Sequence, residues 1–123
     1  MLFEHYSQVP SKLWRWQSFT PKEIACRGTG EILINQDALD KLQLLRDIIK
    51  KPLYINSAYR SALHNARVGG APMSSHKKGI AFDISLRNHN IEDLHKTALK
   101  AGFTGFGIYQ TFLHVDTGRV RQW

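Results

Sequence analysis

The chain has 123 residues, of which 42% are hydrophobic and 22% are charged. This length is typical of one domain, and this composition argues against a disordered chain or a coiled coil. No apolar run approaches the roughly 20 residues that a transmembrane helix needs. The single cysteine, Cys26, excludes an internal disulfide framework and a multi-cysteine zinc site. We therefore expect one domain over residues 1–123, with residues 1–12 as an N-terminal extension.

The charge is strongly positive, because 17 Lys and Arg residues face 10 Asp and Glu residues, a formal net charge of +7. Such an excess favours anionic partners: nucleic acid, a membrane surface or an anionic cell-wall polymer. The cations are scattered along the chain, however, and no zinc finger, recognition helix with a basic arm or aromatic RNA-binding motif is present. The pattern therefore favours a solvated basic surface and predicts no nucleic-acid partner.

The first predicted helix begins at Thr20-Pro21-Lys22-Glu23, which combines a Thr cap, Pro at the first helical position and Glu three residues after the cap. It should end by Gly28 or Gly30. Just before it, Trp14 and Trp16 could form a sugar-binding platform or close a small core. We favour the core.

Asp37–Lys50 is the clearest helix, because its apolar residues recur at the spacing of one buried face and Pro52 follows it. A strand over 53–57 and a short helix over 61–68 come next. Residues 80–86 alternate between apolar and polar or small side chains, as a strand with one buried face does.

Asn90 caps a predicted helix over 91–100, and strands over 106–109 and 112–117 close the chain. Helices gather early and strands dominate late. The predicted fold class is α+β, a small antiparallel sheet flanked by helices.

Two segments carry metal-ligand chemistry. Asp83 lies on the polar face of its strand beside the small residues Gly79 and Ala81, and His76 lies in the loop that enters this strand. An imidazole and a carboxylate are ligands that zinc accepts. In the last strand His114 and Asp116 share one face, so His114 could supply a third ligand. Two imidazoles and one carboxylate leave a fourth position for water, the open arrangement of a catalytic zinc.

These residues also have ordinary structural explanations. Most histidines in small proteins are surface residues or hydrogen-bonded residues, and Asp83 alone could be an edge-strand charge. Asp116 alone could form a turn before Gly118. We assign the four other histidines to this structural class: His5, His64, His89 and His95.

The pattern Ser74-x-His76-x-x-Gly79-x-Ala81-x-Asp83, followed about thirty residues later by a strand histidine, resembles the zinc D-alanyl-D-alanine peptidases. These bacterial and phage enzymes cut peptidoglycan stem peptides and share a fold with the Hedgehog signalling domain. The resemblance extends to Asn56–Ser61, Gly107–Tyr109 and His114–Gly118. It covers residues 13–123 and is nearest to the short, single-domain phage and prophage type.

The resemblance implies that zinc is the cofactor and that its ligands are His76, Asp83 and His114. It makes Arg60 the cation that holds a substrate carbonyl or its developing oxyanion. It also implies substrate contacts, which we place at Ser74, Asn65 and Tyr59.

The sequence departs from the family pattern at the general base. Many relatives have Glu three positions before the last ligand or His two positions before it, and these positions are Thr111 and Phe112 here. Asp116 is the best remaining candidate, or it orients a metal-bound histidine instead. Glu23 and Glu31 are more remote candidates.

The sequence thus predicts a monomeric, endolysin-like zinc peptidase that hydrolyses amide bonds in peptidoglycan stem peptides or cross-links. The start of the chain has no secretory signal pattern, so we expect synthesis in the bacterial cytoplasm. Action would follow at the cell wall or periplasm after release, or as part of a virion. The alternatives are a D,D-carboxypeptidase or dipeptidase with the same site, and an inactive wall-binding or virion structural module.

Overall fold

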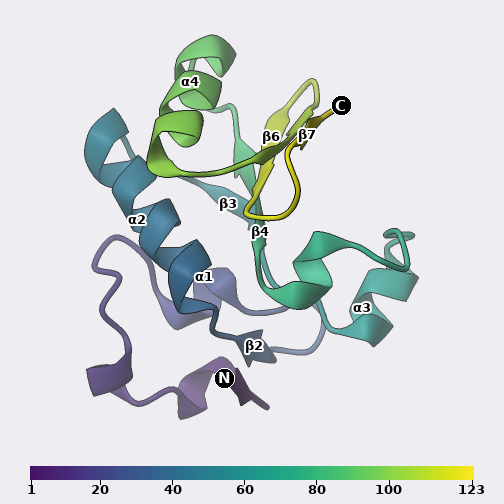
Figure 1. The fold of residues 1–123 in the computed structure, drawn as a ribbon. Helices are drawn as coiled ribbons and strands as arrows, with labels where there is room; N and C mark the ends of the chain where they lie inside the picture. Colours follow the sequence, from purple (N-terminus) through teal and green to yellow (C-terminus); the bar gives the residue numbers. More distant parts are fainter.

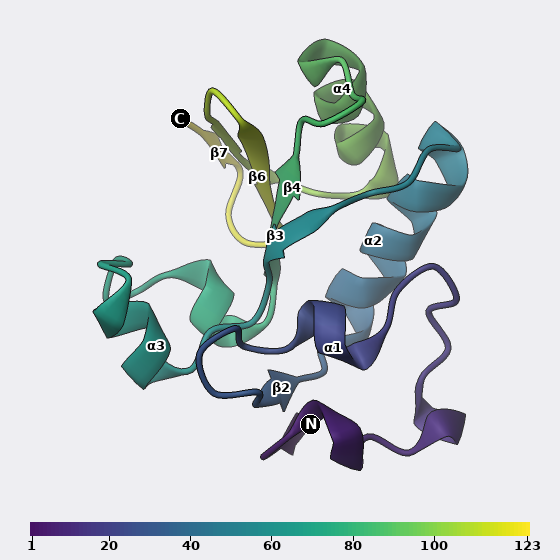
Figure 2. The same cartoon turned by 180° about the vertical axis from the view of Figure 1, so that it is seen from behind.

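The computed structural model describes every residue from 1 to 123. Helices α2 and α4 lie on one side of a central sheet and α3 lies on the other (Figure 1 and Figure 2). None of the helices combines the length and the hydropathy needed to span a bilayer. The helices are α1 (Pro21–Ile24), α2 (Gln36–Ile49), α3 (Ala62–Arg67) and α4 (Ile91–Ala101), and 3₁₀ turns cover Tyr6–Gln8, Ser11–Leu13 and Ser75–Lys78.

The central sheet has five strands in the order β3-β4-β6-β5-β7. All neighbouring pairs are antiparallel except β5 and β7, which are parallel. The predicted α+β class with a small sheet flanked by helices is confirmed, and the parallel edge strand is an addition to it. The strands are β3 (Ile55–Ser57), β4 (Ala81–Ser85), β5 (Gly105–Ile108), β6 (Phe112–Asp116) and β7 (Arg121–Gln122).

The N-terminal residues form a second, two-stranded sheet with a segment of the main body. Strand β1 (Leu2–Phe3) pairs with β2 (Ile32–Leu33), and the terminal amine donates to the carbonyl of Ile34 at 3.1 Å. Phe3 and Tyr6 pack against the main core. The first twelve residues are therefore attached to the domain by both hydrogen bonds and apolar contacts.

The helix boundaries follow from the capping residues that the sequence displays. Thr20 accepts from the backbone N–H of Glu23 and the Glu23 carboxylate accepts from the N–H of Thr20, so α1 starts with a complete capping box. Asn35 and Asn90 cap α2 and α4 with one hydrogen bond each, in which the side-chain oxygen accepts from the backbone N–H of Ala38 or Asp93. Lys50 ends α2 in the left-handed conformation.

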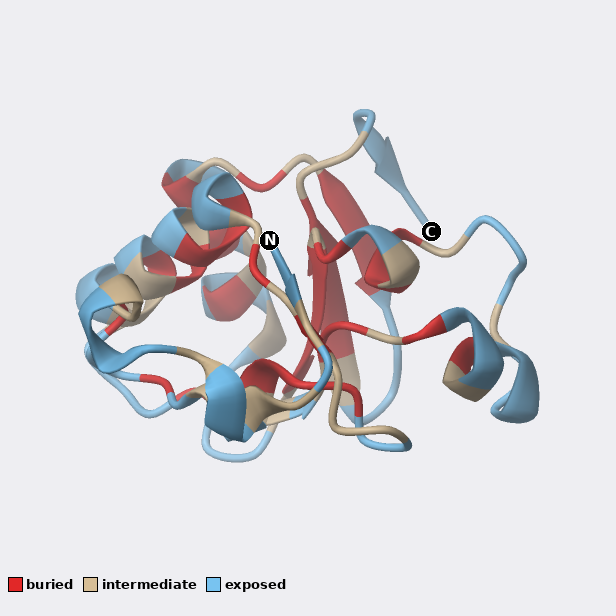
Figure 3. Cartoon of the chain, turned by 90° about the horizontal axis from the view of Figure 1, so that it is seen from below, coloured by how far each residue is buried: buried red, intermediate tan, exposed pale blue.

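The core lies between one face of the sheet and helices α2 and α4 (Figure 3). Phe82 and Ile84 of β4 and Leu113 and Val115 of β6 are almost fully buried there. Trp16 joins the same core with 2% of its surface exposed. The prediction that the tryptophans close a core is therefore confirmed for Trp16.

The opposite face of the sheet carries polar and small side chains in register. Asp83 of β4 lies directly across from His114 of β6, and Gly107 of β5 flanks His114 on its other side. One step along, Asp116 lies between Ala81 and Gly105. Since side chains alternate along a strand, the residues that bury the core also fix this second set on the face toward α3.

Candidate metal centre

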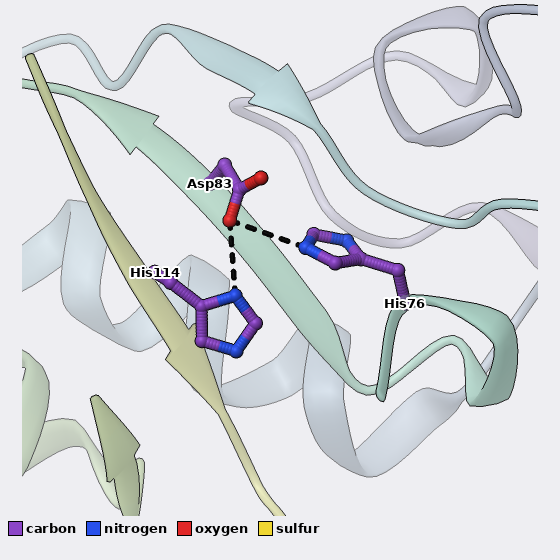
Figure 4. Close-up of side chains that lie close together, drawn as sticks. All are labelled: His76, Asp83 and His114. Carbon is purple, nitrogen blue, oxygen red and sulfur yellow. Dashed lines mark hydrogen bonds and ion pairs between the residues drawn. The ribbon is translucent and has the colours of Figure 1, made fainter. Parts of the chain in front are cut away.

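Three side chains from separate elements meet on this face. His76 comes from the 3₁₀ turn Ser75–Lys78, Asp83 from β4 and His114 from β6 (Figure 4). His76 Nε2 lies 3.2 Å and His114 Nδ1 lies 3.0 Å from the same oxygen, Asp83 Oδ1. One ligand atom from each residue lies within 4.8 Å of the others, and all three residues are buried.

The separations between Asp83 Oδ1 and the two histidine nitrogens fit a tetrahedral metal ion. Two ligand atoms about 2.1 Å from a zinc ion, at a tetrahedral angle, lie about 3.4 Å apart. The separations of 3.2 and 3.0 Å between nitrogen and oxygen are close to this value. Three protein ligands of the two-imidazole, one-carboxylate type also leave one coordination position open.

The surrounding hydrogen bonds select the imidazole tautomers that a metal requires. His76 Nδ1 lies 2.7 Å from the carbonyl oxygen of Ala58, which can only accept, so Nδ1 carries the proton and the lone pair is on Nε2. His114 Nε2 lies 2.8 Å from Asp116 Oδ2. If that carboxylate is ionised, Nε2 donates to it and the lone pair of the neutral ring is on Nδ1. Both lone pairs then face Asp83 Oδ1.

Charge and hydrogen bonding keep both carboxylates ionised. In the metal-free protein, burial alone would raise the pKa of Asp83, but the contacts with the His114 and His76 rings outweigh burial and hold the pKa at about 2. Burial likewise opposes ionisation of Asp116, whose pKa is held at about 2 by His114 and by the N–H of Gly118. Burial would lower the pKa of His114, yet the two carboxylates beside it raise that pKa above its usual value.

Asp116 is completely buried and engaged at both oxygens. Its Oδ2 accepts from His114 Nε2, from the Ser75 hydroxyl at 3.2 Å and from Arg121 at 3.2 Å. Its Oδ1 accepts from the backbone N–H of Gly118 at 3.0 Å. Of the two roles that the sequence left open for Asp116, these contacts favour orientation of His114, since a general base needs an oxygen that reaches the reacting water.

Arg60 lies next to the trio and is held in place by its neighbours. One of its terminal nitrogens lies 3.5 Å from Asp83 Oδ2. Its Nε donates to the Ser57 hydroxyl at 3.1 Å, and its other terminal nitrogen lies 3.4 Å from Asn65 Oδ1. The guanidinium is thus fixed beside the metal position, where it could bind a substrate oxygen.

The trio lies in a cleft of about 1040 Å³ whose walls come from two parts of the chain. Residues 69–78 form one wall, and residues 109–123 supply most of the other. Ser74 lines this cleft, as expected of a substrate contact. Asn65 is buried behind Arg60, and Tyr59 is buried with its backbone bonded to Ile24, so neither lines the cleft. Their predicted substrate contacts receive no support from this geometry.

The remaining candidates lie outside the cleft. The Glu23 carboxylate completes the cap of α1, and Glu31 also lies elsewhere. The four other histidines do not line the cleft either. His5 caps a 3₁₀ turn, His89 bonds to the carbonyl of Pro52, and His95 packs on Phe106.

Sequence reasoning missed five residues that contribute to the site. They are Ser75, Arg121, Trp123 and two glycines of β5, Gly105 and Gly107. Ser75 and Arg121 bind Asp116, and Trp123 packs on His114 with ring centroids 4.9 Å apart. The glycines leave room for the carboxylate of Asp116 and the indole of Trp123. Alternate glycines in Gly105–Ile108 were a readable signal, because they remove side chains from one face of a strand.

Comparison with known proteins identifies the family. A family model described as peptidase M15 matches residues 17–116. The chain belongs to the peptidase M15 family. This M15 match contains the whole metal-binding trio and ends at Asp116, so Arg121 and Trp123 lie beyond it.

Two curated relatives of this M15 chain carry informative names. The peptidoglycan L,D-endopeptidase MepK of Escherichia coli is 32% identical over 99 residues, which cover 73% of this chain and 54% of the relative. The zinc D-Ala-D-Ala carboxypeptidase of Streptomyces albus G is 34% identical over 89 residues, which cover 68% of this chain and 35% of the relative. The chain thus spans about half the length of the first relative and about a third of the second.

Proposed function

We propose that this M15 chain is a zinc-dependent peptidoglycan peptidase that hydrolyses amide bonds in stem peptides or cross-links. One observation carries the proposal. The carbonyl of Ala58 binds Nδ1 of His76, and Asp116 binds Nε2 of His114. These two contacts direct both imidazole lone pairs at Asp83 Oδ1, inside a cleft. The names of the two relatives support zinc as the metal and peptidoglycan peptides as the substrate.

A zinc ion held by His76, Asp83 and His114 would supply Lewis-acid chemistry, which activates water for attack on an amide carbonyl. Arg60 would donate hydrogen bonds to the carbonyl oxygen as negative charge develops on it. Its contacts with Ser57 and Asn65 keep the guanidinium in position, so little reorganisation is needed when the substrate binds. Ser74 would contact polar groups of the peptide.

The mechanism also needs a group that accepts the proton of the attacking water. Asp83 and Asp116 are the only carboxylates that line the cleft. Asp116 stays the predicted general base only if its bond to His114 opens during turnover, because both of its oxygens are engaged. We propose instead that Asp116 is a positioning residue, which keeps the proton on His114 Nε2 and leaves Nδ1 for the metal.

The cleft places the trio between its two walls, with Gly69 on one wall and Trp123 on the other. An endopeptidase would release fragments that are cut within the peptide. A D,D-carboxypeptidase would release only the terminal residue, and a dipeptidase would cleave only free dipeptides.

Digestion of purified cell walls, with mass spectrometry of the released fragments, tests the proposal. We expect fragments from the wild-type protein and none from His76→Ala or Asp83→Ala proteins whose circular dichroism shows the native fold. Removal of metal with a chelator should abolish release, and added zinc should restore it. A wild-type protein that binds zinc but releases no peptide from any wall type would favour the wall-binding module.

To act on peptidoglycan, the protein must reach the cell wall. We propose endolysin-like action from a phage or prophage, as a monomer released to the wall or carried by a virion. The net charge of +7 would concentrate the protein on an anionic wall polymer. Since salt screens this attraction, cosedimentation with walls should weaken as ionic strength rises.

A further inference from the structure

We propose that β7 and the residue after it form a strap that holds the last metal ligand, with Arg121 and Trp123 as positioning residues for His114. The inference rests on the proposed metal-dependent function and adds two residues to its machinery. Neither residue belongs to the metal-binding trio, and both lie outside residues 17–116, where the chain matches the M15 family model.

The backbone of the strap is tied to β5. The N–H of Trp123 donates to the carbonyl of Phe106 at 2.9 Å, and the carbonyl of Trp123 accepts from the N–H of Ile108 at 2.8 Å. The N–H of Arg121 donates to the carbonyl of Thr104 at 3.3 Å. These bonds run along the strand that lies beside His114, so the strap has a fixed position relative to the metal centre.

Arg121 acts through Asp116. Its guanidinium lies 3.2 Å from Asp116 Oδ2, the same oxygen that accepts from His114 Nε2. The positive charge of Arg121 favours the ionised carboxylate and fixes one side of it, while Ser75 binds it from the other wall of the cleft. An Asp116 carboxylate held in this way keeps the orientation of the His114 ring.

Trp123 acts on the ring itself. Its indole packs on the His114 imidazole at an interplanar angle of 50°, with 4.9 Å between ring centroids. Gly107 makes this packing possible, because a Cβ at that position would lie 2.6 Å from the indole. The indole N–H donates to the Tyr109 hydroxyl at 2.7 Å, and the Arg121 guanidinium lies 4.3 Å from the indole centroid.

The two contacts act at different places on one imidazole. The chain Arg121–Asp116–His114 holds the Nε2 atom and so limits rotation about the Cβ–Cγ bond, and the Trp123 indole packs against the ring. Positioning partners of metal ligands commonly contribute 10–100-fold to metal affinity. We therefore expect the strap to affect zinc binding even though it supplies no ligand atom.

Zinc affinity of the full-length chain, measured by competition with a chromogenic chelator, tests the strap. We expect Arg121→Ala and Trp123→Ala each to weaken zinc binding about tenfold, the lower end of the range for such partners. Arg121→Lys keeps a donor for Asp116, and Trp123→Phe keeps a ring over Gly107, so both should recover much of the affinity. Nitrogen-15 NMR of His114 should show a mixture of tautomers in Arg121→Ala and a single tautomer in the wild type.

Arg87→Ala is the matched control, because Arg87 also packs over an aromatic ring, that of Tyr54, but does not line the cleft. It removes the same charge and should bind zinc with wild-type affinity. The strap is refuted if wild-type protein binds zinc and cuts wall peptides while Arg121→Ala and Trp123→Ala bind zinc equally tightly. A wild-type protein that binds no zinc would instead overturn the proposed function.

Discussion

Replacement of Asp116 by Ala should destabilise the metal-free protein and weaken zinc binding together. The change removes the acceptor for His114 Nε2–H and for the Ser75 hydroxyl, and both residues are more than 90% buried. A buried polar group left without a partner costs roughly 1–3 kcal/mol. Ser75 Oγ lies 3.5 Å from His114 Nε2 and can accept from it, so only the Ser75 O–H loses its acceptor, and we expect a loss of about 1–3 kcal/mol. The Arg121 guanidinium is more exposed and can turn to water, so it adds little.

Urea denaturation in the presence of a chelator measures this loss directly. A typical domain has a free energy of unfolding of about 5–15 kcal/mol, so a loss of this size moves the midpoint far outside experimental error. Zinc competition on the same protein should show affinity lower by about 10–100-fold. If Asp116→Ala has the same urea midpoint and the same zinc affinity as the wild type, the reasoning is refuted.

Asp116→Asn separates the two roles that the sequence left open. The amide oxygen can still accept from His114 Nε2–H, but the amide nitrogen then faces the N–H of Gly118 and loses that hydrogen bond. Zinc affinity should therefore fall less than in Asp116→Ala. An amide cannot take a proton from water, however. If Asp116 is the general base, the Asn protein still binds zinc but loses turnover; if Asp116 only orients His114, it keeps much of its rate of wall digestion.

Three further predictions follow from the same contacts. Gly105→Ala places a Cβ against the Asp116 carboxylate, so we expect a loss of about 1–3 kcal/mol in urea denaturation and weaker zinc binding. Arg60→Lys loses the forked geometry and should lower kcat on a defined wall peptide with little change in zinc affinity. The raised pKa of His114 stabilises the metal-free protein fully below about pH 6.5, the unfolded value, and this stability disappears as pH rises through the folded pKa. Zinc must displace that proton, so zinc titrations should show weaker binding at lower pH, and affinity that is flat from pH 5 to 8 would contradict the assignment.

Much of the fold was predictable because local signals agreed with the tertiary structure. The cap at Thr20 predicts the start of α1, and the apolar period of α2 and the cap at Asn90 place α2 and α4 within one residue of their observed bounds. Helix α1 ends at Ile24, earlier than the expected end at Gly28 or Gly30. The alternation in β4 and β6 separated core from polar face correctly. Strands β1, β2 and β7 were missed, because two residues are too few to show a period and their pairing is set by distant segments.

The candidate site was predictable where a side chain follows from strand alternation. That argument placed Asp83 and His114 on one face, and the structure brings them together with His76. It could not place Tyr59 or Asn65, because loop side chains have no period to follow. Nor could it show that Asp116 is enclosed, since that depends on Ser75 and Arg121, which approach from opposite sides of the cleft.

Because Asp83 pairs directly with His114 across β4 and β6, metal binding depends on the register of these two strands. Because successive strand residues point to opposite faces, sliding β6 by a single position would direct its imidazole into the apolar interior and bring Leu113 or Val115 opposite Asp83. A misaligned chain would have no trio to offer, so the ion would stabilise only correctly aligned molecules. Added zinc should therefore raise the yield of refolding as well as the melting temperature.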